Sequence, residues 1–181
     1  MKLTLKGDDK DKVNEFHKMD ELEMKEKVEE LTLSKLMECA QEGDVEAQYN
    51  LGVFHMFFDK DKLEGITNGF EWYKKAAENG LKEAQFNLAC LYIDGINEDD
   101  DDEENEEKGF KWFQKSAEQG FVKSKLCLSL CYEHGIGVDI DKEKSFELLK
   151  EIEDEKNNYL IQFCLGVHYE NGIGVQQDKK K

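Results

Sequence analysis

The sequence contains no arginine and no proline. All 25 basic residues are therefore lysines, and they face 42 acidic residues, which gives a formal net charge of −17. An acidic surface repels polyanions, so we expect no nucleic acid partner and favour a basic protein or peptide instead. Without proline, turns must be made by glycine, asparagine and aspartate.

Long apolar stretches are also absent. No segment approaches the roughly 20 apolar residues that span a bilayer, so we expect no membrane insertion. The first twelve residues are rich in Lys and Asp and contain no apolar run, which excludes a secretory signal there. The five cysteines are odd in number and scattered, as expected for reduced thiols. These features predict a cytoplasmic protein, with the nucleus as the alternative.

Two sequence elements recur along the chain, and this recurrence is the strongest indication of the fold. The first element occurs four times with offsets of 37, 40 and 37 residues. Its copies occupy residues 47–55, 84–92, 124–132 and 161–169. The second element occupies residues 70–80 and 110–120, with weaker copies at 33–43 and 146–157. Agreement at two independent elements predicts a repeat protein.

Each unit of the repeat has the pattern of two helices. The first helix has apolar residues on two sides, so it must lie between neighbours, and the second has one apolar face. Small residues at regular positions allow the helix axes to approach closely. Gly43, Gly80 and Gly120 follow second helices, where a left-handed residue ends a helix, and Asn157 takes the fourth such position. Asp139 or Asp141 can cap the second helix of the third repeat.

The combined string A-x-x-x-L-G-x-x-Y-x-x-G-x-G-V and W-Y/F-x-x-A-A-x-x-G resembles the Sel-one-like repeat family, which is related to the tetratricopeptide repeat. The resemblance covers about residues 33–175. It implies an all-α fold: a right-handed α/α superhelix (solenoid) of stacked antiparallel helix pairs, with about nine helices. It also implies an adaptor or scaffold for protein complexes. Repeat one departs from G-x-G-V at residues 57–61, and repeat two keeps only Gly95-Ile-Asn97.

These patterns predict a division of the chain into segments. Residues 1–12 form a mobile leader and residues 13–32 a capping helix, because the end of a solenoid needs a polar face. The solenoid consists of a half repeat at 33–43, repeats at about 44–80, 81–120 and 121–157, a half repeat at 158–175, and then a polar tail at 176–181. Either the chain ends on a half repeat, or it is the repeat region of a longer signalling, ubiquitin-related or membrane-associated protein.

The acidic run from Glu98 to Glu107 holds nine carboxylates in ten residues, and we place it in the inter-helix loop of repeat two. The simpler interpretation is a solvated, mobile insertion, because blocks of like charge repel. The functional alternative is an electrostatic contact for a Lys- or Arg-rich partner. It lacks the spaced ligands of a calcium loop. The candidate partner-binding residues in it are Asp99, Asp100, Asp101, Asp102, Glu103 and Glu104.

The sequence gives little indication of a catalytic or metal-binding site. Cys127, Cys131 and His134 have a helical spacing that can hold a metal, but the same repeat positions elsewhere carry packing residues, so packing is favoured. His55 and His168 also occupy scaffold positions. We predict no metal, no cofactor and no catalytic residue. Cysteine-rich members of the Sel-one-like repeat family suggest a hydrolase-like activity as an alternative, but this sequence shows no nucleophile–base pair that supports it.

The candidate binding surface follows from the tetratricopeptide analogy, in which first helices line the concave side. The positions in repeats one, two and three are Glu46, Asn50 and Val53; Glu83, Asn87 and Cys90; and Lys123, Cys127 and Leu130. Asn50 and Asn87 can alternatively satisfy backbone groups between repeats. We therefore expect a protein or peptide partner, with end-to-end self-association as a further prediction.

Overall fold

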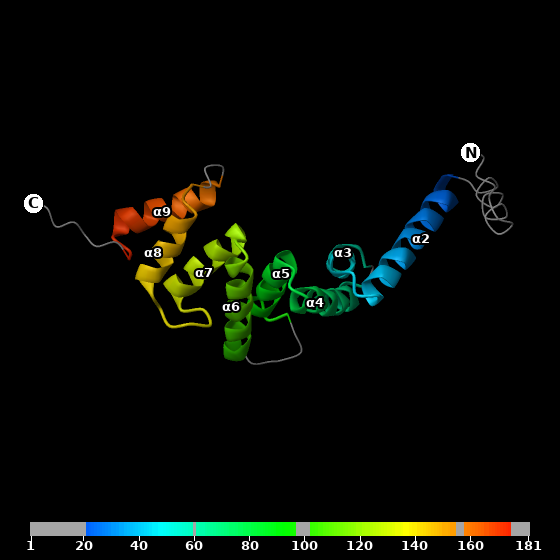
Figure 1. Cartoon of the computed structure of the whole chain (residues 1–181), viewed down its shortest axis with the longest axis horizontal. Coiled ribbons are helices and arrows are strands. Elements are labelled where there is room, and N and C mark those ends of the chain that lie inside the picture. Colours follow the sequence, from blue (N-terminus) through cyan, green and yellow to red (C-terminus); the bar gives the residue numbers. More distant parts are fainter. Residues whose placement is uncertain (1–20, 60, 97–101, 155–157, 175–181) are drawn as a thin grey trace, which may run out of the picture.

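The computed structural model describes residues 21–59, 61–96, 102–154 and 158–174 (Figure 1). The predicted leader at 1–12 and tail at 176–181 lie outside these residues, as do Asn157 and Asp99 to Asp101. Within the described ranges the chain forms eight helices and no strand. The all-α prediction is therefore confirmed, and the expected number of about nine helices is close.

The helices alternate between the two types that the repeat predicts. We call α3, α5, α7 and α9 the A helices, because they carry the first element, and α2, α4, α6 and α8 the B helices. Their bounds are α2 Glu21–Gln41, α3 Val45–Phe58, α4 Lys62–Glu78, α5 Lys82–Ile93, α6 Asp102–Glu118, α7 Val122–His134, α8 Lys142–Glu151 and α9 Tyr159–Asn171.

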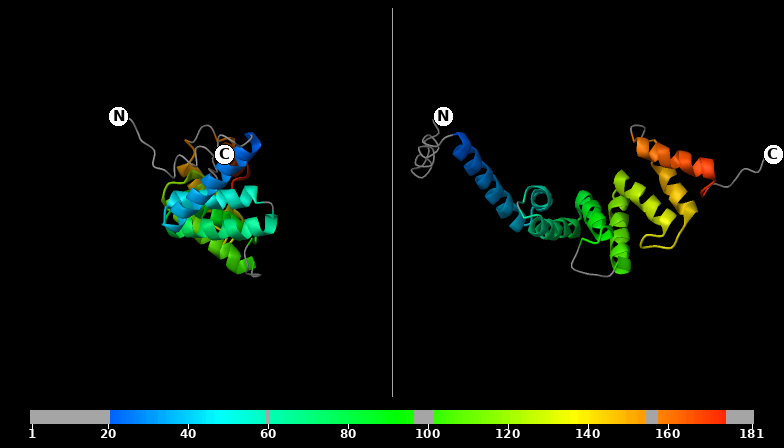
Figure 2. Two further views of the ribbon diagram at one scale, coloured as in Figure 1. Left: turned by 90° about the vertical axis from the view of Figure 1, so that its right-hand side faces the viewer. Right: turned by 180° about the vertical axis from the view of Figure 1, so that it is seen from behind.

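Successive helices pack on one another in chain order, and this produces an elongated arc rather than a ball (Figures 1 and 2). In Figure 1 the two ends of the arc, α2 and α9, rise on the same side, and α6 extends furthest on the opposite side. One helix, α2, runs without interruption across the predicted division between the capping helix at 13–32 and the half repeat at 33–43.

Small residues let the A and B helices of one repeat approach closely. A Cβ atom added to Gly69 of α4 would lie 3.1 Å from the Gly52 carbonyl oxygen of α3. One repeat later, a Cβ on Gly109 would lie 3.0 Å from the Ala89 carbonyl oxygen. The recurrence shows that the small residues set the same A–B spacing in both repeats.

A buried glutamine joins consecutive repeats. The Gln48 side-chain amide donates to the Ala40 carbonyl of α2 at 3.1 Å, and its oxygen accepts from the Asn79 side chain at 3.0 Å. Gln85 makes the same two contacts one repeat later, at 3.1 and 2.7 Å. Each glutamine thus bridges two successive B helices, with its donor and its acceptor both paired. We refer to this arrangement as the glutamine bridge.

An edge-to-face aromatic pair marks the last three of the four described junctions between a B helix and the next A helix. The ring pairs are Phe70–Tyr92, Phe110–Tyr132 and Phe146–Tyr169, with centroids 5.4, 5.3 and 5.3 Å apart. Such pairs add specific geometry to the burial of apolar area. This contact is the most regular one along the solenoid.

The turn residues behave as the sequence predicts. Gly43, Gly80 and Gly120 have φ values of +97°, +95° and +79°, so the left-handed helix ends are confirmed. Asp141, the second of the two capping candidates, accepts a hydrogen bond from the Lys144 amide at 2.9 Å and caps α8. At these four positions, backbone and side-chain chemistry end or begin a helix where the repeat pattern places the boundary.

The G-x-G turns that follow α7 and α9 contact the preceding B helix. A Cβ on Gly137 would lie 2.2 Å from the Glu106 carbonyl oxygen of α6, and one on Gly174 would lie 2.1 Å from the Lys142 carbonyl oxygen of α8. Only glycine allows these contacts. Gly95, in the incomplete turn of repeat two, has nothing within 4 Å of an added Cβ.

Candidate partner-binding surface

The nine predicted A-helix positions are all at least partly accessible. We call this set the A-helix surface. Its exposed members are Glu46, Asn50 and Lys123, and its half-buried members are Val53, Glu83, Asn87, Cys90, Cys127 and Leu130. The intervening residues Leu51, Leu88 and Leu128 are buried in the core. Three consecutive A helices therefore present equivalent positions in register, while their other faces are used for packing.

Asn87 is tied to the preceding repeat. Its side chain interacts with Tyr73, whose ring is buried and packs where a Cβ on Gly52 would otherwise lie. Burial raises the Tyr73 pKa to about 12, with the nearby Tyr49 adding to the rise and Asn87 lowering it. That Asn50 and Asn87 satisfy backbone groups between repeats stays a prediction. Asn50, at the equivalent position, is exposed.

Three thiols gather where α5 meets α7. Burial is the main cause that raises the pKa of Cys90 to about 11, of Cys127 to about 12 and of Cys131 to about 11. These groups are thiols, not thiolates, at neutral pH, and thiolate is the form that attacks substrates or ligates metals. The described parts of the chain hold no group of three or more His, Cys, Asp or Glu residues that could bind a metal ion. Cys127 and Cys131 serve packing here, as the repeat alignment favours.

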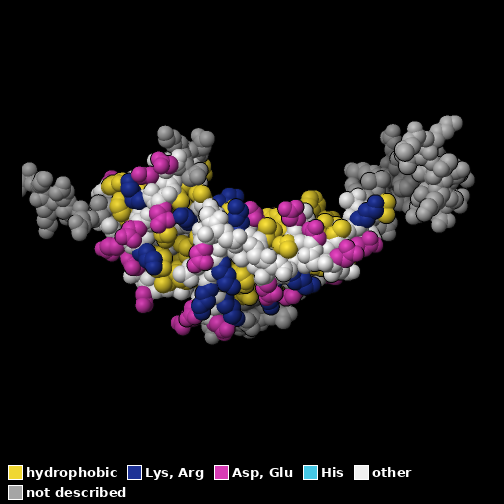
Figure 3. Space-filling view, in the orientation of Figure 1, with side chains coloured by type: hydrophobic (Ala, Val, Ile, Leu, Met, Phe, Trp, Pro, Cys, Tyr) yellow, Lys and Arg dark blue, Asp and Glu magenta, His cyan; other side chains and the backbone are white. Residues whose placement is uncertain are grey.

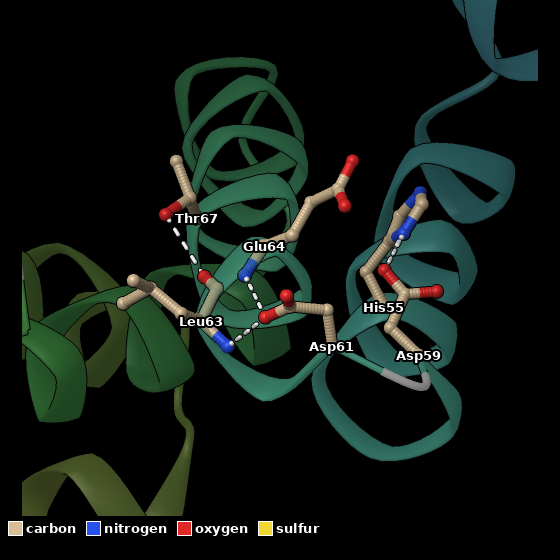
Figure 4. Close-up of polar contacts among 6 residues, drawn as sticks. All are labelled: His55, Asp59, Asp61, Leu63, Glu64 and Thr67. Atoms are coloured by element: carbon tan, nitrogen blue, oxygen red, sulfur yellow. Dashed lines mark hydrogen bonds and ion pairs between the residues drawn. The ribbon is translucent and has the colours of Figure 1, made fainter.

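Both histidines at scaffold positions have protein partners. His55 Nδ1 lies 2.8 Å from the Asp59 carboxylate in the turn after α3 (Figure 4). His168 is buried; its Nδ1 lies 2.9 Å from the Cys164 carbonyl oxygen and its Nε2 lies 3.3 Å from the Ser145 hydroxyl. Sequence reasoning missed this Ser–His contact. Because both side chains are buried, neither faces a space where a substrate could bind.

The acidic run is partly helical, which corrects the sequence prediction. Residues Asp102 to Glu107 form the first turns of α6 instead of belonging to the inter-helix loop. Acidic residues stabilise a helix N-terminus, and lysines one turn later offset the repulsion: Glu104 pairs with Lys108 at 3.0 Å and Glu107 with Lys111 at 3.1 Å. Glu103 and Glu104 are exposed. The side chain of Asp102, like Asp99 to Asp101, lies outside the described part.

Repeat one replaces the G-x-G-V turn with an aspartate cap. Asp61 accepts hydrogen bonds from the Leu63 and Glu64 amides at 2.9 and 3.2 Å and so begins α4 (Figure 4). The adjoining Phe57 and Phe58 are exposed at the end of α3. The sequence showed the departure from the motif, but not that large aromatic side chains would remain uncovered there.

None of the helices in the described ranges is long and apolar enough to cross a membrane.

Comparison with known proteins agrees with this geometry. The Sel1 repeat model matches residues 45–81, 82–121, 124–152 and 162–181. No curated protein matches the sequence. Each matched copy begins at or within an A helix, and the first three extend through the following B helix.

Two solved structures have the same fold. One is c5321, a protective antigen of uropathogenic Escherichia coli strains that displays an SLR fold, with 27% identity and a TM-score of 0.70 over 81% of this chain. The other is a Sel1 repeat protein from Oxalobacter formigenes, with 24% identity and a TM-score of 0.68 over 82% of this chain. This chain spans only 30% and 59% of the lengths of those two proteins.

Proposed function

Since the chain belongs to the Sel1 repeat family, we propose that it is a non-enzymatic adaptor that binds a protein or peptide, of basic character, through the A-helix surface. Sel1 repeats indicate a scaffold for protein–protein interactions, and the family is generally non-enzymatic. The observation that carries the proposal is the register of accessible positions on α3, α5 and α7 over a fully packed core. The protonated, part-buried thiols there suit contact better than chemistry.

Charge supports a basic partner. The chain carries −17, and two of the nine A-helix positions, Glu46 and Glu83, are carboxylates. Figure 3 shows acidic side chains along the length of one face, with lysines gathered near α6. Glu103 and Glu104, at the start of α6, extend the acidic character toward the outer side. Complementary charge of this kind mainly accelerates association and selects the partner.

Two further proposals accompany this one. The five cysteines are free thiols, which suits a reducing compartment such as the cytoplasm. Because the chain spans under two thirds of the two solved relatives, it can also serve as the repeat region of a longer protein, in which the A-helix surface would bring a partner to another domain.

The test is a pair of charge reversals with equal net charge. The double variant Glu46→Lys with Glu83→Lys changes the A-helix surface, and Glu71→Lys with Glu78→Lys changes exposed positions of the B helix α4. Fluorescence anisotropy with a lysine-rich peptide library should show about tenfold weaker binding for the first variant, a weaker salt dependence, and less than about twofold change for the second. Equal losses in both variants would mean that only bulk charge matters, and the A-helix surface would be rejected.

A further inference from the structure

The two ends of the described solenoid expose helices of opposite type. At one end, the A helix α9 has no B helix on its outer side, although α3, α5 and α7 are each followed by one. At the other end, the B helix α2 packs on α3 but has no A helix before it within the described residues. Each end therefore lacks the kind of helix that the other end presents.

The outer face of α9 is uncovered position by position. Tyr169 is 55% exposed, whereas its repeat equivalents Tyr92 and Tyr132 are 9% and 7% exposed. Phe163 is 66% exposed, whereas the equivalent Phe86 is half-buried and packs against Phe113 of the following B helix in a tilted ring pair, with centroids 5.7 Å apart. Both differences arise because no B helix follows α9 within the described residues.

The backbone of α9 also shows the missing contact. Gly166 has no atom within 4 Å of an added Cβ. Its equivalents Gly52, Ala89 and Ser129 are buried. At Gly52 and Ala89 the carbonyl oxygen is the atom that the small residue of the following B helix approaches. The B helices α4 and α6 carry glycine at this position, and α8 carries the buried Ser145, so the face of α9 suits a helix with a small residue there. The equivalent residue of α2 is Thr32.

The helix α2 has the complementary gap. Cys39 is exposed, whereas the residues at the same B-helix position, Ala76 and Ser116, are fully buried. Leu31 is 49% exposed. The residue equivalent to Leu31 is Asn68 in α4, and in α6 and α8 it is Lys108 and Lys144, which lie over Tyr92 and Tyr132 of the preceding A helix. By the same geometry, Leu31 would cover the tyrosine of an A helix placed before α2.

Charge does not oppose contact between these two faces. The helix α9 carries a single carboxylate, Glu170, and no lysine, in a chain of net charge −17. The stretch of α2 from Leu31 to Gln41 has one lysine and one glutamate. Both faces are therefore close to neutral, and like-charge repulsion, which would separate other parts of two copies, is smallest where these ends meet.

We propose that α9 of one molecule packs against α2 of a second copy and so completes a repeat across the junction. Leu36 of the second copy contacts Phe163, as Phe113 of α6 contacts Phe86. Leu31 of the second copy covers Tyr169, as Lys108 of α6 covers Tyr92. The contact uses two different surfaces, so it is heterologous, and each further copy can add to the open end. This inference concerns self-assembly and does not depend on the A-helix surface.

The competing occupant of the α9 face is a B helix supplied by residues that follow in a longer chain. By repeat alignment Lys179 corresponds to Lys142, the first residue of α8, so only three positions of such a helix fall within this sequence. A second copy supplies a whole B helix, on which Leu31 is exposed and Leu36 is half-buried against the core between α2 and α3. The two occupants predict different masses for the natural full-length protein, so the experiment separates them.

The test uses two variants that each block one end, Phe163→Asp on α9 and Leu31→Asp on α2. Sedimentation velocity over a dilution series should show concentration-dependent oligomers for the natural chain. Each variant should lower the association constant at least about tenfold, because a carboxylate must be buried at the junction. An equimolar mixture of the two should form a dimer but nothing larger, because each variant keeps one intact end. The double variant should stay monomeric in every mixture.

The control is Leu63→Asp, an equally drastic change at an exposed position of α4 away from both ends, which should assemble like the natural chain. Far-UV circular dichroism confirms that each variant remains folded. A natural chain that stays monomeric at all concentrations overturns the proposal, and so does a mixture of blocked variants that forms no dimer. Binding of lysine-rich peptides to the A-helix surface should be unchanged in all variants, so failure here leaves the proposed adaptor function standing.

Discussion

The middle of the solenoid, α3 to α6, and its C-terminal part, α7 to α9, use the same aromatic contacts but different polar ones. In the middle, the glutamine bridge of Gln48 and Gln85 is buried and fully paired. In the third repeat Lys125 takes the equivalent position and forms an ion pair with Glu151 at 2.6 Å. Loss of one partner costs more free energy in a buried neutral bridge than in a half-exposed ion pair, because water cannot reach the buried group to replace the lost hydrogen bond.

The C-terminal part compensates by another contact. Its B helix α8 has 10 residues, against 17 in both α4 and α6, and α9 packs on it only sparsely. Yet it has the two complete G-x-G turns, whose second glycines contact the preceding B helix. The comparison teaches that repeats of one family can hold their spacing either by side-chain bridges or by backbone contact at the turn.

The largest expected effect comes from the turn. Gly137→Ala places a Cβ 2.2 Å from the Glu106 carbonyl oxygen at a φ of +64°, and we expect a loss of about 3 kcal/mol in unfolding free energy. Gly95→Ala, in the incomplete turn of the middle part, meets no atom and should lose only about 1–2 kcal/mol for its positive φ. Urea unfolding followed by circular dichroism measures both. Equal losses would show that the turn of the third repeat contributes no special contact.

The next effect concerns the bridges. Gln85→Met keeps the volume of the side chain but leaves the Ala77 carbonyl and the Gln119 amide without their partner, and we expect a loss of about 2 kcal/mol. Lys125→Met removes a half-exposed ion pair and should cost about 0.5 kcal/mol. The same urea titrations give both values. If the lysine variant lost as much as the glutamine variant, the contrast between the two parts would be wrong.

The repeat pattern allowed the fold to be predicted because its informative positions are recurring small and aromatic residues, such as Gly69 and Gly109 or Phe70 and Phe110, whose contacts are local and recur. The prediction that the start of α6 lies in a loop was wrong. It was based on repulsion between neighbouring carboxylates and did not consider that acidic residues stabilise a helix N-terminus. The interaction between Asn87 and Tyr73 could not be predicted, because it depends on side-chain orientations that the spacing of residues does not encode.

Some features of the candidate sites could be predicted from the sequence, and others could not. Accessibility of the A-helix surface follows from helical periodicity, since the alternate face must be buried between neighbours. The open faces at the two ends required the structure. The weak copy of the second element at residues 33–43 indicates from the sequence that a B helix lies at this end of the described solenoid. It does not indicate that Cys39 and Leu31 are exposed there.

Near neutral pH the smallest effect is expected at the seam between the two parts, where Cys90, Cys127 and Cys131 meet, because these thiols are protonated there in both the folded and the unfolded chain. Burial raises their pKa values from 9.0 to about 11–12, so the folded state holds these protons more tightly than the unfolded chain. The sign follows from linkage: this contribution to stability is complete below pH 9, and falls as pH rises toward 11–12. Replacing all three by alanine should flatten the decline of the unfolding free energy between about pH 9 and pH 11, measured in urea at each pH.

Thiol labelling at about pH 8 provides an independent measurement of the same seam, because only thiolate reacts. Exposed Cys39 should react first, half-buried Cys90 and Cys127 should react more slowly, and buried Cys131 should react only as fast as α5 and α7 separate. Gly137→Ala, which loosens the contact between the α7 turn and α6, should accelerate labelling of Cys127 and Cys131 without changing Cys39. If all four cysteines reacted at the same rate in the natural chain, the middle and C-terminal parts would not be packed together at this seam. The glutamine bridges of one part and the turn contacts of the other could then not be compared as two ways of holding adjacent repeats together.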